Sequence, residues 1–271
     1  MGKLDYNLLN KANILAYMRS LIKLPCNSGW QSDWGIALNT PVNSPALNFI
    51  VNQPIDNPAS IPQMIQDTIQ FFSKTKSAFS WWPLVDSLTP EIEFYLISAG
   101  FSVEYIAPWM AAELDNKLEI SAEIPDKTFT IHNSNQDDAA IQFTNWAEAY
   151  CKGFNIAEEL FPELITYTTA MLTAKDPCLN LFAINKDGRT AATGLLFISE
   201  QTAGLYSISV LPRFRGLGLG KFMTQSLMNF AQKRGCRAAI LQSSIDGCGL
   251  YQRLGFRQTG FSPVYKYTFQ V

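Results

Sequence analysis

The second half of the chain has the clearer pattern of hydrophobic and polar positions. Apolar residues recurring every third or fourth position predict helices over residues 137–154, 159–174, 219–234 and 247–255. Alternating or continuous apolar runs predict strands over residues 127–133, 178–184, 190–199, 203–210, 237–244 and 257–269. The Asp187-Gly188 pair is a strong signal for a hairpin turn between two of these strands. An antiparallel meander followed by strand–helix–strand crossovers predicts an α/β fold with a mixed sheet and helices on its faces.

The end of the first half repeats part of this order. It predicts helices over residues 61–77 and 90–101 and strands over 78–84 and 102–114. The segment EFYLISAGF resembles LYQRLGF in the second half, and each closes a short helix before a strand. We interpret this as a diverged internal repeat, the alternative being a chance likeness between two strand–helix–strand units. With the polar stretch 115–127 as junction, the sequence predicts two domains, over residues 1–118 and 126–271.

The composition is that of a globular protein and excludes several classes. Of 271 residues 47% are hydrophobic and 16% charged, and the net charge is −2, which argues against a disordered chain or a generally basic nucleic-acid binder. The five scattered cysteines form no C-x-x-C pair and His132 is the single histidine, so neither a disulfide framework nor a metal site is predicted. Without a signal-peptide pattern or a run long enough to cross a bilayer, we expect a cytoplasmic protein that binds no membrane.

Three glycines at alternating positions, Gly216, Gly218 and Gly220, lie between the strand 203–210 and the helix that follows it. A Walker A loop would need glycine at position 215 and serine or threonine at 222, where the chain has Arg215 and Phe222. The dinucleotide fingerprint fails because its third glycine falls on a lysine or a methionine. A string of glycines before a helix still lets backbone amides approach a pyrophosphate at the positive end of the helix. We therefore favour phosphate binding over a loop that serves chain geometry alone.

The segment SVLPRFRGLGLG resembles the acetyl-CoA-binding motif of the Gcn5-related N-acetyltransferases (GNAT), and GLYQRLGF resembles a second motif of that family. The resemblance covers residues 127–271 and implies a GNAT-like fold, with the first half as a degenerate copy that lacks the glycine loop. It implies acetyl-CoA as co-substrate and transfer of the acetyl group to a primary amine. Tyr251 would protonate the departing thiolate, and Tyr206 lies on a strand that could contact the substrate. The residues implied in binding acetyl-CoA are Ile208, Ser209, Val210, Arg213, Arg215, Gly216, Leu217, Gly218, Leu219, Gly220, Lys221 and Ser244.

The chain departs from the family pattern in ways that affect the chemistry. Ser244 and Gly247 stand where the family often has asparagine and alanine, and no acid lies on the strand before the loop to act as general base. An ordinary tyrosine, with a pKa of about 10, is a poor base near neutral pH. A water relay or an already neutral amine would serve instead. Glu158, Glu159 and Glu163 are further candidates for binding an amine, and the sequence does not rank them.

Two other functions stay open at this point. The missing acid is compatible with a protein that binds CoA for regulation or interaction and has little or no catalytic activity. A nucleic-acid binder using Arg213, Arg215 and Lys221 is disfavoured by the acidic composition. The acceptor's identity is not fixed by the sequence, and a homodimer is compatible with it.

Overall fold

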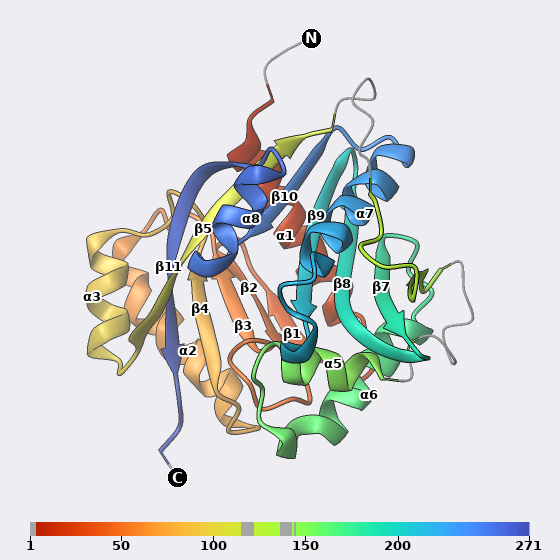
Figure 1. Ribbon diagram of the computed structural model, residues 1–271. Helices are drawn as coiled ribbons and strands as arrows, with labels where there is room; N and C mark the ends of the chain where they lie inside the picture. The colour runs from red at the N-terminus through yellow and green to blue at the C-terminus, as the bar shows by residue number, and fades with distance from the viewer. Residues whose placement is uncertain (1–3, 115–121, 136–142, 144, 271) are drawn as a thin grey trace.

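A single sheet of 11 strands runs through the molecule and contains strands from both halves of the chain (Figure 1). The computed structural model describes residues 4–114, 122–135, 143 and 145–270. The strands are β1 (Ser28–Gln31), β2 (Gly35–Asn39), β3 (Phe49–Asn52), β4 (Phe79–Pro83), β5 (Ser102–Glu113), β6 (Phe129–Asn133), β7 (Leu179–Lys186), β8 (Arg189–Ser199), β9 (Thr202–Val210), β10 (Ala238–Gln242) and β11 (Arg257–Tyr267). The helices are α1 (Tyr6–Ile22), α2 (Ile61–Ser73), α3 (Pro90–Ser98), α5 (Trp146–Gly153), α6 (Phe161–Thr173), α7 (Leu219–Lys233) and α8 (Ile245–Arg253).

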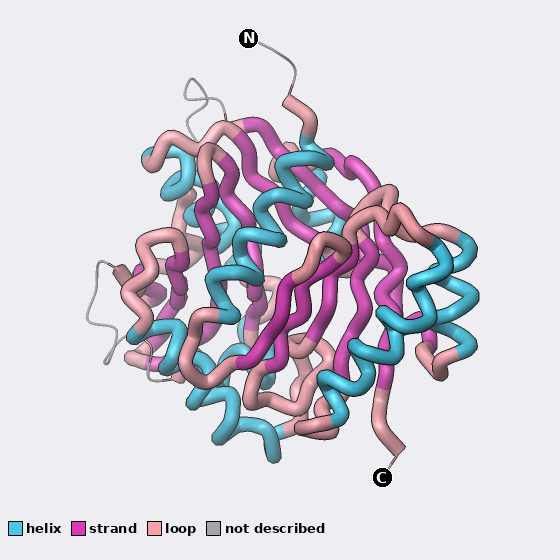
Figure 2. Tube along the Cα trace, turned by 180° about the vertical axis from the view of Figure 1, so that it is seen from behind, coloured by secondary structure: helices cyan, strands magenta, loops and turns pink. Residues whose placement is uncertain are grey.

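Helices cover both faces of the sheet, and each face has its own core. Apolar residues of α1, α5 and α6 pack on one face in a single cluster that includes side chains of β2, β5, β7 and β8. On the other face α7 and α8 pack on one half of the sheet, and α2 and α3 pack on the other half. In Figure 2 the long helix α1, which begins next to the N-terminus, crosses the middle of the sheet. None of the helices in the described part of the chain is long and apolar enough to cross a membrane.

The final strands of the two halves have exchanged places. The sheet order is β1-β2-β3-β4-β11-β5-β10-β9-β8-β7-β6, so β5 of the first half lies between β10 and β11 of the second. Conversely, β11 lies between β4 and β5 of the first half. Each half also contains one parallel pair, β3 with β4 and β9 with β10. The mixed α/β sheet predicted from the sequence is confirmed, whereas the division into domains 1–118 and 126–271 stays a prediction.

Local sequence signals predicted most of the helices and strands of the second half correctly. The hairpin between β7 and β8 turns at Asp187 and Gly188, whose φ angles are 50° and 73°. Gly235 and Gly255 follow the ends of α7 and α8 with φ angles of 81° and 89°, as expected for glycines that stop a helix. The helix expected over 137–154 is α5, which begins at Trp146; residues 136–142 and 144, like 115–121 of the junction, lie outside the described residues.

Neither α1 nor β1 to β3 was predicted from the sequence. The buried side of α1 carries the fully buried asparagines Asn10 and Asn13 among its apolar residues. Polar residues at buried positions interrupt the apolar repeat that marks an amphipathic helix. Strands β1 and β3 have only four residues each, too few for a clear alternation.

Candidate functional site

Strands β9 and β10 separate and leave a gap beside the end of β9. They are paired only from Ala238↔Thr202 to Ile240↔Gly204, and no further pair between them is recorded among the described residues. On its other side β9 stays paired with β8 as far as Val210↔Ala192. Beyond Gly204 the edge of β9 that faces β10 is unpaired, and we call the space along this edge the β9–β10 gap. It offers backbone groups to an extended ligand, as a strand edge does in β-augmentation.

A β-bulge at Ser207 lies shortly after the point where β9 and β10 separate. The register between β8 and β9 shifts between Thr193 and Leu195, and Ser207 has a φ of 52°. The Thr193 hydroxyl donates to the Ser207 carbonyl oxygen over 2.9 Å and holds the bulge in place. A bulge bends its strand and increases the local twist, which directs the end of β9 away from β10.

Val210 and Ile208 present their backbone groups to the gap. The Leu211 amide donates to the Ala191 carbonyl on β8 over 2.9 Å. Because backbone groups alternate in direction along a strand, the N–H and C=O of Val210 point away from β8. The Arg215 Nε donates to the Val210 carbonyl over 3.2 Å, so the Val210 N–H is the group left for a ligand.

The glycine loop leaves the start of α7 rich in free donors. Gly216 and Gly218 have φ angles of 78° and 80°, and Gly218 is the N-cap of α7 without a side-chain hydrogen bond. The first backbone bond recorded into the helix is from Phe222 N to Gly218 O, at 3.0 Å. The first turn holds no acid and carries the exposed Lys221. An uncapped, positive helix end with a cation beside it is unfavourable alone, and a bound anion would stabilise it.

Two arginines of the loop are occupied by protein partners. The Arg213 guanidinium lies over the Phe214 ring at 4.9 Å from its centroid. Arg215 donates through Nη2 to the Gly153 carbonyl at the end of α5, over 3.1 Å, and its amide donates to Pro212 O over 3.2 Å. The Arg215 side chain therefore fixes the loop against β9 and α5, and the free amides begin at Gly216. Of the leucines, Leu219 is buried in the core below α7 and Leu217 is exposed.

Tyr251 lies on α8, half-buried against the same core as α7. Its ring meets Phe256 edge-on with centroids 5.7 Å apart. Burial raises the pKa of Tyr251 to about 12, so its phenol stays protonated through the neutral range and can act as a donor. The Ser244 hydroxyl oxygen accepts from Gly247 N over 3.1 Å and caps α8. A Cβ at Gly247 would lie 3.2 Å from the Tyr251 ring, so the family's alanine would crowd this packing.

Tyr206 is held on the other face of the sheet, under α1. Its hydroxyl donates to Asn13 Oδ1 over 2.8 Å, and its ring stacks on Tyr17 with centroids 4.4 Å apart. Burial is the main cause that raises the pKa of Tyr206 well above its usual value. A phenol with these partners fits a structural or positioning role better than the role of a base.

The structure ranks the three glutamates that the sequence left open. Glu158 and Glu159 are exposed in a turn before α6. Glu163 lies in the first turn of α6, and its Oε2 is buried without a hydrogen-bond partner in the described part of the chain. Next to it, Leu164 and Tyr167 line a cavity of about 10 Å³ that reaches Ser207. This is near the lower limit for one water, so the cavity as it stands admits no amine substrate.

The first half of the chain has no equivalent gap among its described residues. All four residues of β3 pair with β4, from Phe49↔Ser80 to Asn52↔Pro83. The following segment carries Pro54 and Pro58, which have no N–H to offer a phosphate. That only the second half binds the co-substrate stays a prediction.

Polar groups of α1 next to the gap were missed from the sequence. Asn10 accepts a hydrogen bond from Gln242, the last residue of β10, and Asn13 accepts one from Tyr206 of β9. The spacing Asn7-x-x-Asn10-x-x-Asn13 was the available signal, since it puts three amides on one side of a helix. That these amides would face the second half of the chain could not be read from the spacing.

A family model and a curated relative match the second half of the chain. The model of the Acetyltransferase (GNAT) family matches residues 141–256. A glucosamine 6-phosphate N-acetyltransferase of Candida albicans is 27% identical over 119 residues, which cover 41% of this chain and 78% of the relative.

Two solved structures resemble the whole chain. A GCN5-related N-acetyltransferase from Kribbella flavida superposes with a TM-score of 0.68 at 16% identity, over 100% of this chain and 98% of the other. A tandem GNAT protein from the clavulanic acid biosynthesis pathway gives 0.60 at 10% identity, over 97% and 94%. At these identities the likeness shows the fold alone. It confirms the GNAT-like fold expected from the sequence.

Proposed function

We propose that this protein, whose residues 141–256 match the model of the Acetyltransferase (GNAT) family, transfers the acetyl group of acetyl-CoA to a primary amine by direct attack. The observation that carries the proposal is the β9–β10 gap, which begins at the Ser207 bulge and ends at the uncapped start of α7. A pyrophosphate at the glycine loop and a pantetheine arm along Ile208 to Val210 would occupy one continuous surface.

The donor side fits acetyl-CoA on two independent features. The amides from Gly216 onward and Lys221 supply positive potential for the pyrophosphate. The Val210 N–H points into the gap and can donate to the thioester carbonyl oxygen, where charge develops during attack. Arg215 supports this arrangement by holding the Val210 carbonyl, which keeps the peptide plane in one orientation.

When bound, acetyl-CoA supplies the thioester carbonyl at which the amine forms a C–N bond while the C–S bond breaks. The amine must be neutral to attack, and its proton leaves to solvent. Tyr251 keeps its phenolic proton through the neutral range and can donate it, or a hydrogen bond, to the departing sulfur. Holding the reactants together along β9 supplies much of the rate, as in other direct-transfer reactions.

The base is the least defined part of the site. No acid lies on β9, and Tyr206 is engaged by Asn13 and Tyr17. Of the three glutamates, Glu163 is the best candidate because one oxygen of its carboxylate is buried and has no hydrogen-bond partner in the described part of the chain. We propose that it attracts the amine, and that proton loss uses water.

Release of free thiol from acetyl-CoA in the presence of a panel of primary amines tests the proposal. We expect turnover with at least one amine and a strong decrease in the Tyr251→Phe variant. Binding of CoA without turnover across the panel would refute acetyl transfer and support the alternative, a CoA-binding regulatory or interaction protein. A homodimer and a cytoplasmic location stay predictions from the sequence.

A further inference from the structure

Three asparagines form a stripe along α1, which belongs to the first half of the chain. Asn7, Asn10 and Asn13 are three residues apart, so they lie on one side of the helix. Asn10 and Asn13 are fully buried. Buried amides are costly unless they are hydrogen-bonded, so their partners indicate what the stripe does.

Asn13 has its hydrogen bonds satisfied and connects α1 to β8 and β9. Its Nδ2 donates to Ser199 Oγ over 2.9 Å and to the Thr202 carbonyl over 3.1 Å. Its Oδ1 accepts from the Tyr206 hydroxyl. A Cβ at Gly204 would lie 2.2 Å from Asn13 Oδ1, so the helix approaches β9 as closely as glycine allows. Asn13 therefore fixes the position of the stripe.

Asn10 is only partly satisfied. Its Oδ1 accepts from Gln242 Nε2 over 2.6 Å, but its Nδ2 is buried without a partner among the described residues. Gln242 is two residues beyond Ile240, where the pairing of β9 with β10 ends, so it lies at the wall of the gap. Asn10 and Asn13 together bridge the two separating strands from the face opposite α7.

Trp109 supplies a second unpartnered donor beside Gln242. It is the residue of β5 paired with Gln242, and it is fully buried. Its indole Nε1 has no hydrogen-bond partner in the described part of the chain. Two donor N–H groups, on Asn10 and Trp109, thus flank Gln242 with nothing to accept from them. A buried donor that stays unpaired is unfavourable, and a ligand acceptor would remove that cost.

A surface groove of about 390 Å³ lies at the start of α1, one helical turn before Asn10. It is lined by Leu4, Asp5, Tyr6, Asn7 and Thr259. Thr259 donates to the backbone carbonyl of Trp109 over 3.4 Å, so one lining residue of the groove contacts the main chain of Trp109. Asn7, one turn before Asn10, has a buried Oδ1 without a partner in the same described region.

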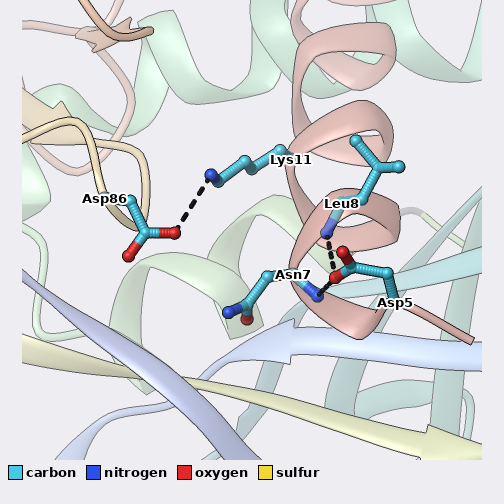
Figure 3. A network of polar contacts seen from close by, with 5 residues as sticks. All are labelled: Asp5, Asn7, Leu8, Lys11 and Asp86. Carbon is cyan, nitrogen blue, oxygen red and sulfur yellow. Dashed lines mark hydrogen bonds and ion pairs between the residues drawn. The ribbon is translucent and has the colours of Figure 1, made fainter.

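Contacts before and after Asn7 hold the first turns of α1 in place (Figure 3). Asp5 caps the helix by accepting from Asn7 N and Leu8 N, each over 3.1 Å. Lys11 reaches Asp86, in the loop after β4, over 3.4 Å. Lys11 is therefore already paired with a carboxylate, and the two unpartnered donors on Asn10 and Trp109 are neutral groups.

We propose that the acceptor amine enters through this groove and carries an uncharged oxygen, as a hydroxyl or a carbonyl, which accepts hydrogen bonds from Asn10 Nδ2 and Trp109 Nε1. This inference rests on the proposed acetyl transfer and names the class of acceptor: an amino alcohol, an amino sugar or an amino amide rather than an alkylamine. An alkylamine of the same size would leave both donors unpaired. Each hydrogen bond that the alkylamine cannot make lowers its binding relative to the oxygen-bearing amine by about tenfold.

The first test measures binding without turnover. The probes are 2-aminoethanol and propylamine, which match in size and differ in the hydroxyl. With the full chain saturated with CoA and labelled with ¹⁵N, the indole cross-peak of Trp109 is assigned through the backbone of β5. We expect 2-aminoethanol to shift this peak and propylamine to leave it in place. Equal shifts, or none, would overturn the inference whether or not the protein transfers acetyl groups.

The second test measures the ratio of kcat/KM for 2-aminoethanol over propylamine. In Asn10→Leu we expect this ratio to fall about tenfold, through KM of the amino alcohol, while KM for acetyl-CoA stays unchanged. Asn39→Leu is the control, because Asn39 is also buried with an unpartnered oxygen but lies on β2. An unchanged ratio in Asn10→Leu, or the same fall in the control, would contradict the proposal. Absence of turnover with any amine would instead refute acetyl transfer and leave the binding test decisive.

Discussion

Replacing Gly216 by alanine separates the cost of a strained backbone from the loss of a phosphate site. Gly216 has a φ of 78°, in the left-handed region, and a Cβ there would meet no atom within 4 Å. Gly188, in the β7–β8 hairpin, has a φ of 73° and equally open surroundings. Alanine at either position therefore costs roughly 1 kcal/mol of stability through the backbone alone. The two substitutions are matched in the protein without ligand.

The Gly216→Ala and Gly188→Ala variants should differ in their affinity for acetyl-CoA. At Gly216 a methyl group would stand between the loop amides and the pyrophosphate, whereas the hairpin at Gly188 is not part of the gap. A hydrogen bond from an amide to a charged oxygen contributes about 1.5–3 kcal/mol, so losing one or two costs about 3 kcal/mol. That corresponds to a rise of roughly a hundredfold in Kd.

Titration calorimetry with acetyl-CoA and thermal unfolding of both variants would measure the two effects. We expect a similar decrease in Tm for Gly216→Ala and Gly188→Ala, of about 2–4 °C for a chain of this size. Only Gly216→Ala should bind acetyl-CoA weakly. Unchanged binding in Gly216→Ala would refute the assignment of the loop, and an equal loss in Gly188→Ala would show that the effect is one of folding.

Four other predictions concern catalysis and stability. Tyr251→Phe should lower kcat by about 10²-fold without changing KM for acetyl-CoA. The rise of the rate with pH should persist, because it reflects deprotonation of the amine substrate. A displaced pH profile would instead assign Tyr251 the role of base. Glu163→Gln should raise KM for the amine several-fold while Glu159→Gln, an exposed control, should not, and equal effects would exclude Glu163 from the site. Burial raises the pKa of Tyr206 and brings the pKa of Tyr251 to about 12. The stability that the two phenols contribute is therefore complete below the pKa of an unfolded tyrosine, about 10, and is lost as the pH rises through their pKa values in the folded protein. Denaturant titrations should therefore show a falling free energy of unfolding above pH 10, and a flat profile would contradict it. Residues 126–271 expressed alone should not form a stable monomer, because β5 would be missing between β10 and β11; a monomer with native CoA affinity would refute this.

The donor side of the site could be predicted because its signals are local. The glycines of the loop, the strand before them and the helix after them are consecutive in the chain, and their spacing reports the geometry directly. The role of Tyr251 came from a motif of the same kind. The Ser207 bulge left no such signal, since it depends on the register against β8 and on the bond from Thr193.

The proposed acceptor side could not be inferred from the sequence because its contacts join residues that are distant in the chain. Asn13 meets Tyr206, and Asn10 meets Gln242, across almost the whole length of the chain. The exchange of β5 and β11 brings these segments together, and no residue of either strand marks it. A pattern that repeats every two or four residues reports which face is buried, and it does not report which partner covers that face.

The exchange also gives the first half of the chain a physical role in the site. One wall of the β9–β10 gap is fixed by β8, whereas the other wall, β10, is fixed by β5, which pairs with it from Ala238↔Glu113 to Gln242↔Trp109. Helix α1 then bridges both walls through Asn10 and Asn13. We therefore expect the first half to be required for the site even without a glycine loop, because it contributes the strand and the helix that hold β10 and bridge the two walls.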